Sequence, residues 1–192
     1  MPISAIIFGG RRSKTIPLIY QAFNWVHGVY LGATLGSETT AAATGAVGIV
    51  RRDPMAMLPF CGYNMADYWG HWLSMTSRTD ESKLPRIFQV NWFRKDAQGR
   101  YIWPGFGENS RVLAWIVGRL DGSAGAEPTA LGNRPRQSDF PLEGLSLNDS
   151  DWSDLFGYDP ASWLAECDLT ETFFARFGDH VPPALTEELA DL

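Results

Sequence analysis

The first 120 residues alternate between apolar runs of strand length and longer segments in which the apolar positions recur with helical spacing. Residues 3–8 form an apolar run that ends at Gly9-Gly10, which is typical of a buried strand. Residues 28–33 and 47–50 also predict strands, whereas residues 17–25 and 65–75 have helical spacing. This succession of strands and helices predicts an α/β fold, with a mixed sheet and flanking helices.

The second half of the chain predicts helices on either side of a connecting segment. Residues 110–120 carry one wide apolar stripe and predict a helix. Residues 121–139 are rich in Gly, Ser, Ala, Pro and Asn, which favours a surface connection. Short amphipathic helices are expected beyond it, at 152–156, 160–167, 171–177 and 183–189. We therefore divide the chain into residues 1–122, a connection at 123–141 and a helical tail at 142–192.

Composition narrows the classes of protein to consider. A chain of 192 residues with 45% hydrophobic and 20% charged residues fits a single folded domain. The net charge of −6 argues against binding to nucleic acid or to an acidic membrane surface, because both need a basic face. The two cysteines, Cys61 and Cys167, are too few for a disulfide framework, and no apolar run approaches membrane-spanning length. These features favour a cytoplasmic protein.

Aromatic residues are concentrated between positions 92 and 106. Five of these fifteen residues are aromatic, where the chain-wide 13% predicts about two: Trp92, Phe93, Tyr101, Trp103 and Phe106. Such a cluster can stack on a planar ring. The alternative is that the rings form the core of a β-hairpin, because residues 96–99 predict a turn between two strand-like runs.

The same segment offers groups that suit a purine. Phe93, Tyr101 and Phe106 can supply two apolar faces, and the Asn109 amide can both donate to and accept from a base edge. The glycines on either side of Phe106 allow the main chain to approach a ligand closely. The residues alone leave two interpretations open: a hairpin core, which such short patterns form more often, and a nucleobase site.

The loop after the first predicted strand is a candidate for phosphate binding. It does not match the P-loop motif, because Phe8 and Ser13 occupy two positions at which that motif has glycine. Arg11 is the better candidate, since its planar guanidinium can bind phosphate oxygens, although a solvated surface arginine is the alternative. His71, among Trp69, Trp72 and Met75, is expected to be a packed core histidine, and we expect no metal site.

Four motifs occur in one order: Phe-Gly-Gly-Arg-Arg at 8–12, Asp-Pro-Met-Ala-Met at 53–57, Gly-Tyr-Asn at 62–64 and Phe-Gly-Glu-Asn at 106–109. On these motifs the chain resembles the C-terminal part of GTP-dependent phosphoenolpyruvate carboxykinase, densely from residue 3 to about 122 and more loosely from 142. The resemblance implies the C-terminal part of that fold. It also implies a set of nucleotide-binding residues: Arg11, Trp92, Phe93, Tyr101, Phe106, Gly107, Glu108 and Asn109.

The small residues at 36–45 correspond to the family's Ω-loop lid, which closes over bound substrates. The expected lid residues are Ser37, Glu38, Thr39, Thr40, Ala41, Ala42 and Ala43. From the residues alone, this segment is equally a plain flexible loop or a short helix. The chain departs from the family pattern at three positions: Ser13 stands for proline, Gly45 for a lid histidine of animal members, and Tyr101 for phenylalanine.

The resemblance implies the conversion of oxaloacetate and GTP to phosphoenolpyruvate, GDP and CO₂ in gluconeogenesis, by a monomeric enzyme. In the family, the Mn²⁺ ligands, the P-loop lysine and most oxaloacetate contacts precede the segment present here. We therefore expect no catalytic residue in this chain and no turnover by it alone. Met1 is interpreted as an internal start or a split gene. The alternatives are a guanine-nucleotide-binding module, a subunit completed by the N-terminal part as a separate chain, or a structural remnant.

Overall fold

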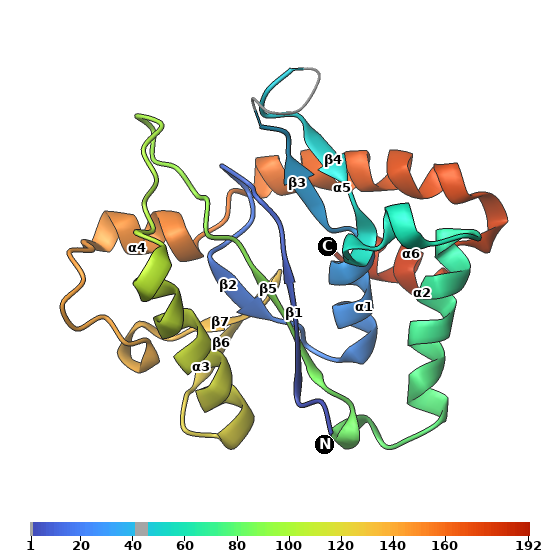
Figure 1. Cartoon of the computed structure of the whole chain (residues 1–192), viewed down its shortest axis with the longest axis horizontal. Coiled ribbons are helices and arrows are strands. Elements are labelled where there is room, and N and C mark those ends of the chain that lie inside the picture. Colours follow the sequence, from blue (N-terminus) through green and yellow to red (C-terminus); the bar gives the residue numbers. More distant parts are fainter. Residues whose placement is uncertain (1, 41–45) are drawn as a thin grey trace.

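The computed structural model describes residues 2–40 and 46–192 and shows a central sheet with helices on both sides (Figure 1). The five-stranded sheet has the order β1-β5-β2-β7-β6. Its strands are β1 (Ala5–Gly9), β2 (Ile19–Gln21), β5 (Arg86–Val90), β6 (Ala126–Thr129) and β7 (Gly132–Pro135). A separate two-stranded sheet joins β3 (Gly36–Glu38) to β4 (Val50–Arg52). The mixed α/β class predicted from the sequence is confirmed.

The central sheet is mixed in direction. β1 runs parallel to β5, with Ile7 opposite Phe88, whereas β2 runs antiparallel to both β5 and β7. Successive residues of β2 point to opposite faces, so Tyr20 enters one hydrophobic core and Ile19 enters the other. The sheet therefore separates two cores.

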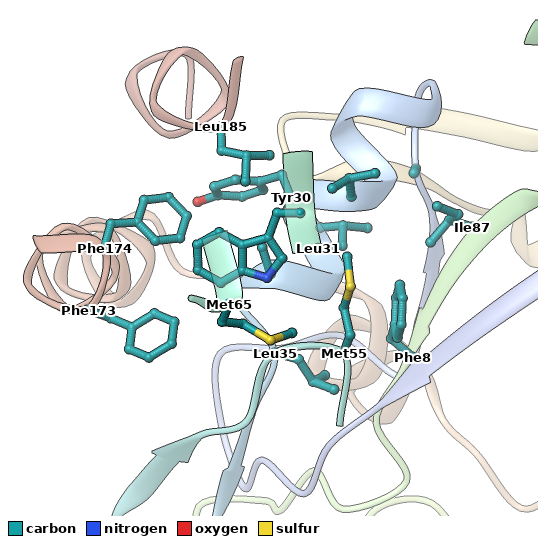
Figure 2. Close-up of a cluster of buried hydrophobic side chains, with 14 of the residues drawn as sticks. Phe8, Tyr30, Leu31, Leu35, Met55, Met65, Ile87, Phe173, Phe174 and Leu185 are labelled. Atoms are coloured by element: carbon teal, nitrogen blue, oxygen red, sulfur yellow. The ribbon is translucent and has the colours of Figure 1, made fainter. Parts of the chain in front are cut away.

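The described residues form six α-helices around the sheet. They are α1 (Trp25–Ala33), α2 (Met65–Leu73), α3 (Asn109–Asp121), α4 (Asp149–Phe156), α5 (Pro160–Phe174) and α6 (Pro183–Ala190). α1, α2, α5 and α6 contribute to the first core, where Tyr30, Phe174 and Leu185 gather (Figure 2). α3 and α4 contribute to the second core, in which Phe88 packs edge to face on Trp115. Within the described residues, no helix has both the length and the apolar character needed to cross a membrane.

In the part of the chain that the structure describes, seven short 3₁₀ helices connect these elements. They are Pro54–Ala56, Leu58–Phe60, Ser74–Ser77, Glu81–Lys83, Phe106–Glu108, Gln137–Asp139 and Ala175–His180. The predicted helices at 110–120 and 65–75 are confirmed, the second as α2 followed by a 3₁₀ turn. Residues 123–141, for which we expect a surface connection, also contain β6 and β7.

Two expectations at the start of the chain are wrong. Residues 17–25 predict a helix but contain β2, and residues 28–33 predict a strand but belong to α1. Asn24 caps α1 by accepting a hydrogen bond from the His27 main chain. A Cβ on Gly28 would lie 2.4 Å from Ile87 Cδ1, so the glycine that weakens the helical pattern allows α1 to pack tightly on β5.

Three smaller expectations also need correction. The strand predicted at 47–50 begins only at Val50 and continues into two arginines as β4. The helices expected at 160–167 and 171–177 are largely one helix, α5, which continues to Phe174. His71 is exposed on α2 and is not a packed core residue.

Candidate functional site

The loop that follows β1 lies directly against β3. A Cβ on Gly10 would lie 2.3 Å from the Gly36 carbonyl oxygen, so only glycine allows this approach. The Arg11 main-chain N–H donates to Ser37 Oγ at 3.1 Å, and the Glu38 N–H donates to the Arg11 carbonyl at 2.7 Å. The candidate phosphate-binding loop and the start of the expected lid are therefore one hydrogen-bonded unit.

Glu38 strengthens this unit through its side chain. Its Oε1 accepts from the Ser13 main-chain N–H at 2.7 Å and from Ser13 Oγ at 2.8 Å. A proline at position 13, as in the resembled family, has neither donor. The side-chain hydrogen bond therefore depends on serine at this position, and the main-chain hydrogen bond requires a residue other than proline.

The two arginines of the loop have different surroundings. Arg11 is half-buried, whereas the buried Arg12 donates to both carboxylate oxygens of Glu166 on α5, at 2.9 and 2.6 Å. Arg52 Nη1 lies 2.8 Å from Glu166 Oε1 and also donates to the Thr34 carbonyl. Burial disfavours the charge on Glu166, but the hydrogen bonds and charges of Arg12 and Arg52 outweigh burial and hold its pKa below the usual range.

This buried cluster, Arg12–Glu166–Arg52, joins the loop after β1 to β4 and α5. Sequence reasoning did not identify Glu166 or Arg52. No local signal could have done so, because Arg12 and Glu166 are 154 positions apart. A buried cluster of this kind positions the main chain that carries Arg11.

Phe93 and Tyr101 meet near Arg11. Their ring centroids lie 6.1 Å apart, edge to face. The Arg11 guanidinium carbon lies 4.8 Å from the Phe93 ring centroid, and Lys95 Nζ lies 4.8 Å from that of Tyr101. The predicted turn at 96–99 is confirmed, although only the bridge between Lys95 and Tyr101 pairs its two arms.

A cavity of about 690 Å³ lies between this turn and the β3–β4 sheet, a size typical of small-molecule sites. The predicted site residues that line it are Arg11, Glu38, Thr39, Thr40, Phe93 and Tyr101. Lys14 and Lys95 also line it, and sequence reasoning missed both. Within the ranges that the structure describes, no ion pair involves Arg11 or either of these lysines. The cavity thus combines aromatic rings with three cations.

The other predicted nucleotide-binding residues do not line this cavity. The Phe106 ring is 95% exposed, and its backbone has φ of 48°, a left-handed conformation that is rare outside glycine. Asn109 Oδ1 accepts from the Trp103 indole N–H at 2.8 Å, which leaves the amide nitrogen as the donor for a ligand. Glu108 pairs with Arg111, and the Gly107 carbonyl accepts from Ser110 Oγ.

The aromatic cluster divides into core and surface residues. Trp103 is 2% exposed and belongs to the second core, and Trp92 packs against the same core. Tyr101 is 56% exposed and, like Phe106, does not belong to that core. The two tryptophans therefore belong to the core between the sheet and its helices and not to the core of a separate hairpin, whereas Tyr101 and Phe106 are exposed.

Part of the expected lid is described, and part is not. Ser37, Glu38, Thr39 and Thr40 are half-buried beside the cavity, whereas Ala41, Ala42, Ala43 and Gly45 lie outside the described residues. In residues 2–40 and 46–192, no group of three or more His, Cys, Asp or Glu side chains could hold a metal ion.

Comparison with known proteins identifies the family of the chain. A family model described as phosphoenolpyruvate carboxykinase C-terminal P-loop domain matches residues 1–192. The phosphoenolpyruvate carboxykinase [GTP] of Paenarthrobacter aurescens (strain TC1) is 50% identical over 190 residues, which cover 99% of this chain and 31% of the relative. That of Renibacterium salmoninarum is 49% identical over 192 residues, covering 100% of this chain and 32% of the relative.

A third relative is equally similar. The phosphoenolpyruvate carboxykinase [GTP] of Neocallimastix frontalis is 50% identical over 190 residues, which cover 98% of this chain and 31% of the relative. The chain thus spans about a third of the length of the curated relatives that it matches. On the family match and these identities, the chain belongs to the GTP-dependent phosphoenolpyruvate carboxykinase family.

Proposed function

We propose that this chain forms the guanine-nucleotide end of a GTP-dependent phosphoenolpyruvate carboxykinase. The complete reaction is the conversion of oxaloacetate and GTP to phosphoenolpyruvate, GDP and CO₂ in gluconeogenesis. The relatives carry this activity in their name, and the chain spans 31% of the first of them. The cavity between the turn at 96–99 and the β3–β4 sheet is the observation that carries the proposal.

The cavity residues suit the separate parts of a nucleotide. Phe93 and Tyr101 present rings on which guanine can stack, and Arg11 presents a planar guanidinium to phosphate oxygens. Phe106 and Asn109 complete the base site when the nucleotide binds, with the Asn109 amide nitrogen as the donor to guanine. Thr39 and Thr40 lie at the start of the lid, which excludes water from the bound substrates.

Mn²⁺, when bound, would supply positive charge that offsets the negative charge of the phosphates during phosphoryl transfer. The described residues do not fit a Mn²⁺ site, because they contain no cluster of three metal-ligating side chains. The ligands belong, in this proposal, to the part of the relatives that this chain does not span. We further propose that the protein is cytoplasmic and monomeric, and that the N-terminal part, if it is a separate chain, is its partner.

Phe106→Ala is expected to weaken GDP binding without unfolding the protein. Stacking of a base on an aromatic ring is worth about 1–3 kcal/mol, so the Kd for GDP should rise about 5- to 150-fold. Because the ring is 95% exposed, the free energy of unfolding should change by less than about 0.5 kcal/mol. Fluorescence titration with GDP and urea unfolding measure the two quantities.

Phe60→Ala is the matched control, because Phe60 is also an exposed phenylalanine but lies in the segment Leu58–Phe60, which has no part in the proposed nucleotide site. It should leave GDP binding unchanged. An unchanged Kd in Phe106→Ala would contradict the assignment of this ring to the base site.

The 192-residue chain is expected to show no carboxykinase turnover when purified. The chain contains no glycine-rich P-loop with its lysine, and its described residues offer no metal site. Oxaloacetate-dependent formation of GDP from GTP, with Mn²⁺ supplied, is the measurement. The complete Paenarthrobacter relative is the positive control, and GDP formation by the purified chain above background would refute the expectation.

A further inference from the structure

Each aromatic ring of the cavity has a cation on one face. Arg11 lies over Phe93 and Lys95 lies over Tyr101, both at 4.8 Å from the ring centroid. The two rings also meet edge to face, which leaves little free ring surface between them. A planar base that stacks on the cation-covered face of either ring must displace that cation.

The acidic groups of the cavity do not hold these cations. Asp96 accepts from Arg100 Nε at 2.9 Å and from the main-chain N–H of Gln98, and the Glu38 carboxylate accepts from Ser13. Lys95 is exposed, and no ion pair among the described residues includes it. The ring of Tyr101 is therefore the attractive partner that the structure gives to the Lys95 ammonium group.

We propose that Lys95 couples base stacking to phosphate binding and so selects phosphorylated guanine compounds over the free nucleoside. This inference rests on the proposed function. Without ligand, Lys95 covers the Tyr101 ring face. The phosphates of a nucleotide attract the ammonium group within the same cavity, which frees that face for the base. Guanosine has no phosphate and must compete with the cation for the ring.

Lys95→Met tests this coupling, because methionine removes the charge and keeps an unbranched side chain. We expect guanosine to bind about two- to five-fold more tightly, the factor that corresponds to an exposed cation–π contact. GDP should bind no more tightly than to the unchanged protein, because its phosphates lose a cationic partner. The Kd for guanosine divided by the Kd for GDP should therefore fall in Lys95→Met. Lys95→Arg, which keeps a cation, should leave this ratio unchanged.

Intrinsic fluorescence can follow the titration of the 192-residue chain and its variants with guanosine and with GDP. These titrations give the dissociation constants for both ligands. Lys83→Met is the control, because Lys83 is an exposed lysine outside the cavity lining and its loss should change neither constant. Weaker or unchanged guanosine binding in Lys95→Met would overturn the coupling while GDP binding by the unchanged protein still supported the proposed function. Absence of GDP binding by the unchanged protein would overturn both.

Discussion

Glu166→Ala is expected to lower the free energy of unfolding by about 3–5 kcal/mol, because it leaves two buried arginines without their carboxylate. The side chains of Arg12 and Arg52 are 6% and 9% exposed, and both bind Glu166 within 3 Å, at 2.6 and 2.8 Å. Removing one partner of such a cluster costs far more than the cluster contributes net to stability. Urea unfolding at pH 7 measures the difference.

The pH dependence of this effect provides an internal check. The pKa of Glu166 is lowered in the folded protein, so its contribution is fully present above the pKa of an unfolded glutamate, about 4.3, and is lost as the pH falls through the folded value. The difference in the free energy of unfolding between the unchanged protein and Glu166→Ala should therefore be constant near neutral pH and become smaller in acid.

Glu171→Ala on the same helix is the matched control, because Glu171 is exposed and its removal should cost less than about 0.5 kcal/mol. Equal stabilities of the Glu166→Ala and Glu171→Ala proteins would show that the buried cluster does not have the energetic role assigned to it.

Arg11→Met is expected to raise the Kd for GDP by about 10- to 150-fold, the loss that corresponds to about 1.5–3 kcal/mol for hydrogen bonds to a charged group. Arg11 lines the cavity, and its main chain is fixed by Ser37 and Glu38, so the guanidinium is held close to the Phe93 ring. Guanosine, which lacks phosphates, should not lose affinity. Parallel titrations with GDP and guanosine separate the two effects.

Arg51→Met is the control for a general loss of positive charge. Arg51 lies on β4 with a side chain that is 70% exposed, and it is outside the cavity lining. If Arg51→Met weakened GDP binding as much as Arg11→Met, the effect would reflect the overall field of the protein and not a phosphate contact.

The sequence predicted those elements that have one apolar face or that end at residues typical of a helix end or a turn. The helix α3 has a wide apolar stripe and ends at Gly122, in the left-handed conformation that often terminates a helix. The turn at 96–99 has the Asp and Gly residues that such a turn needs. Both were predicted within one or two residues.

The first helix and the second strand could not be assigned from their own residues. Leu18, Ile19 and Tyr20 are fully buried in the centre of the sheet, so they form a continuous apolar run that a buried helix would share. Gly28 and Gly32 weaken the helical pattern of α1, yet they are present because Ile87 and Phe8 pack against them. Tertiary contacts decided both cases.

The candidate site also depends on tertiary contacts that the local sequence does not reveal. Motif resemblance identified Arg11, Phe93 and Tyr101, and the structure brings them to one cavity. The different surroundings of Arg11 and Arg12, side by side in the motif, depend on Glu166 and Arg52 far along the chain. The cation over each ring likewise depends on side-chain placement that no spacing rule contains.

Nuclear Overhauser contacts from bound GDP to the protein are the most direct test of the nucleotide site. The proposed site predicts contacts between guanine H8 and the ring protons of Phe93 and Tyr101, at GDP concentrations at which ADP gives none. Contacts from the base to residues other than Phe93, Tyr101, Phe106 and Asn109, or equal contacts from adenine, would contradict the central claim.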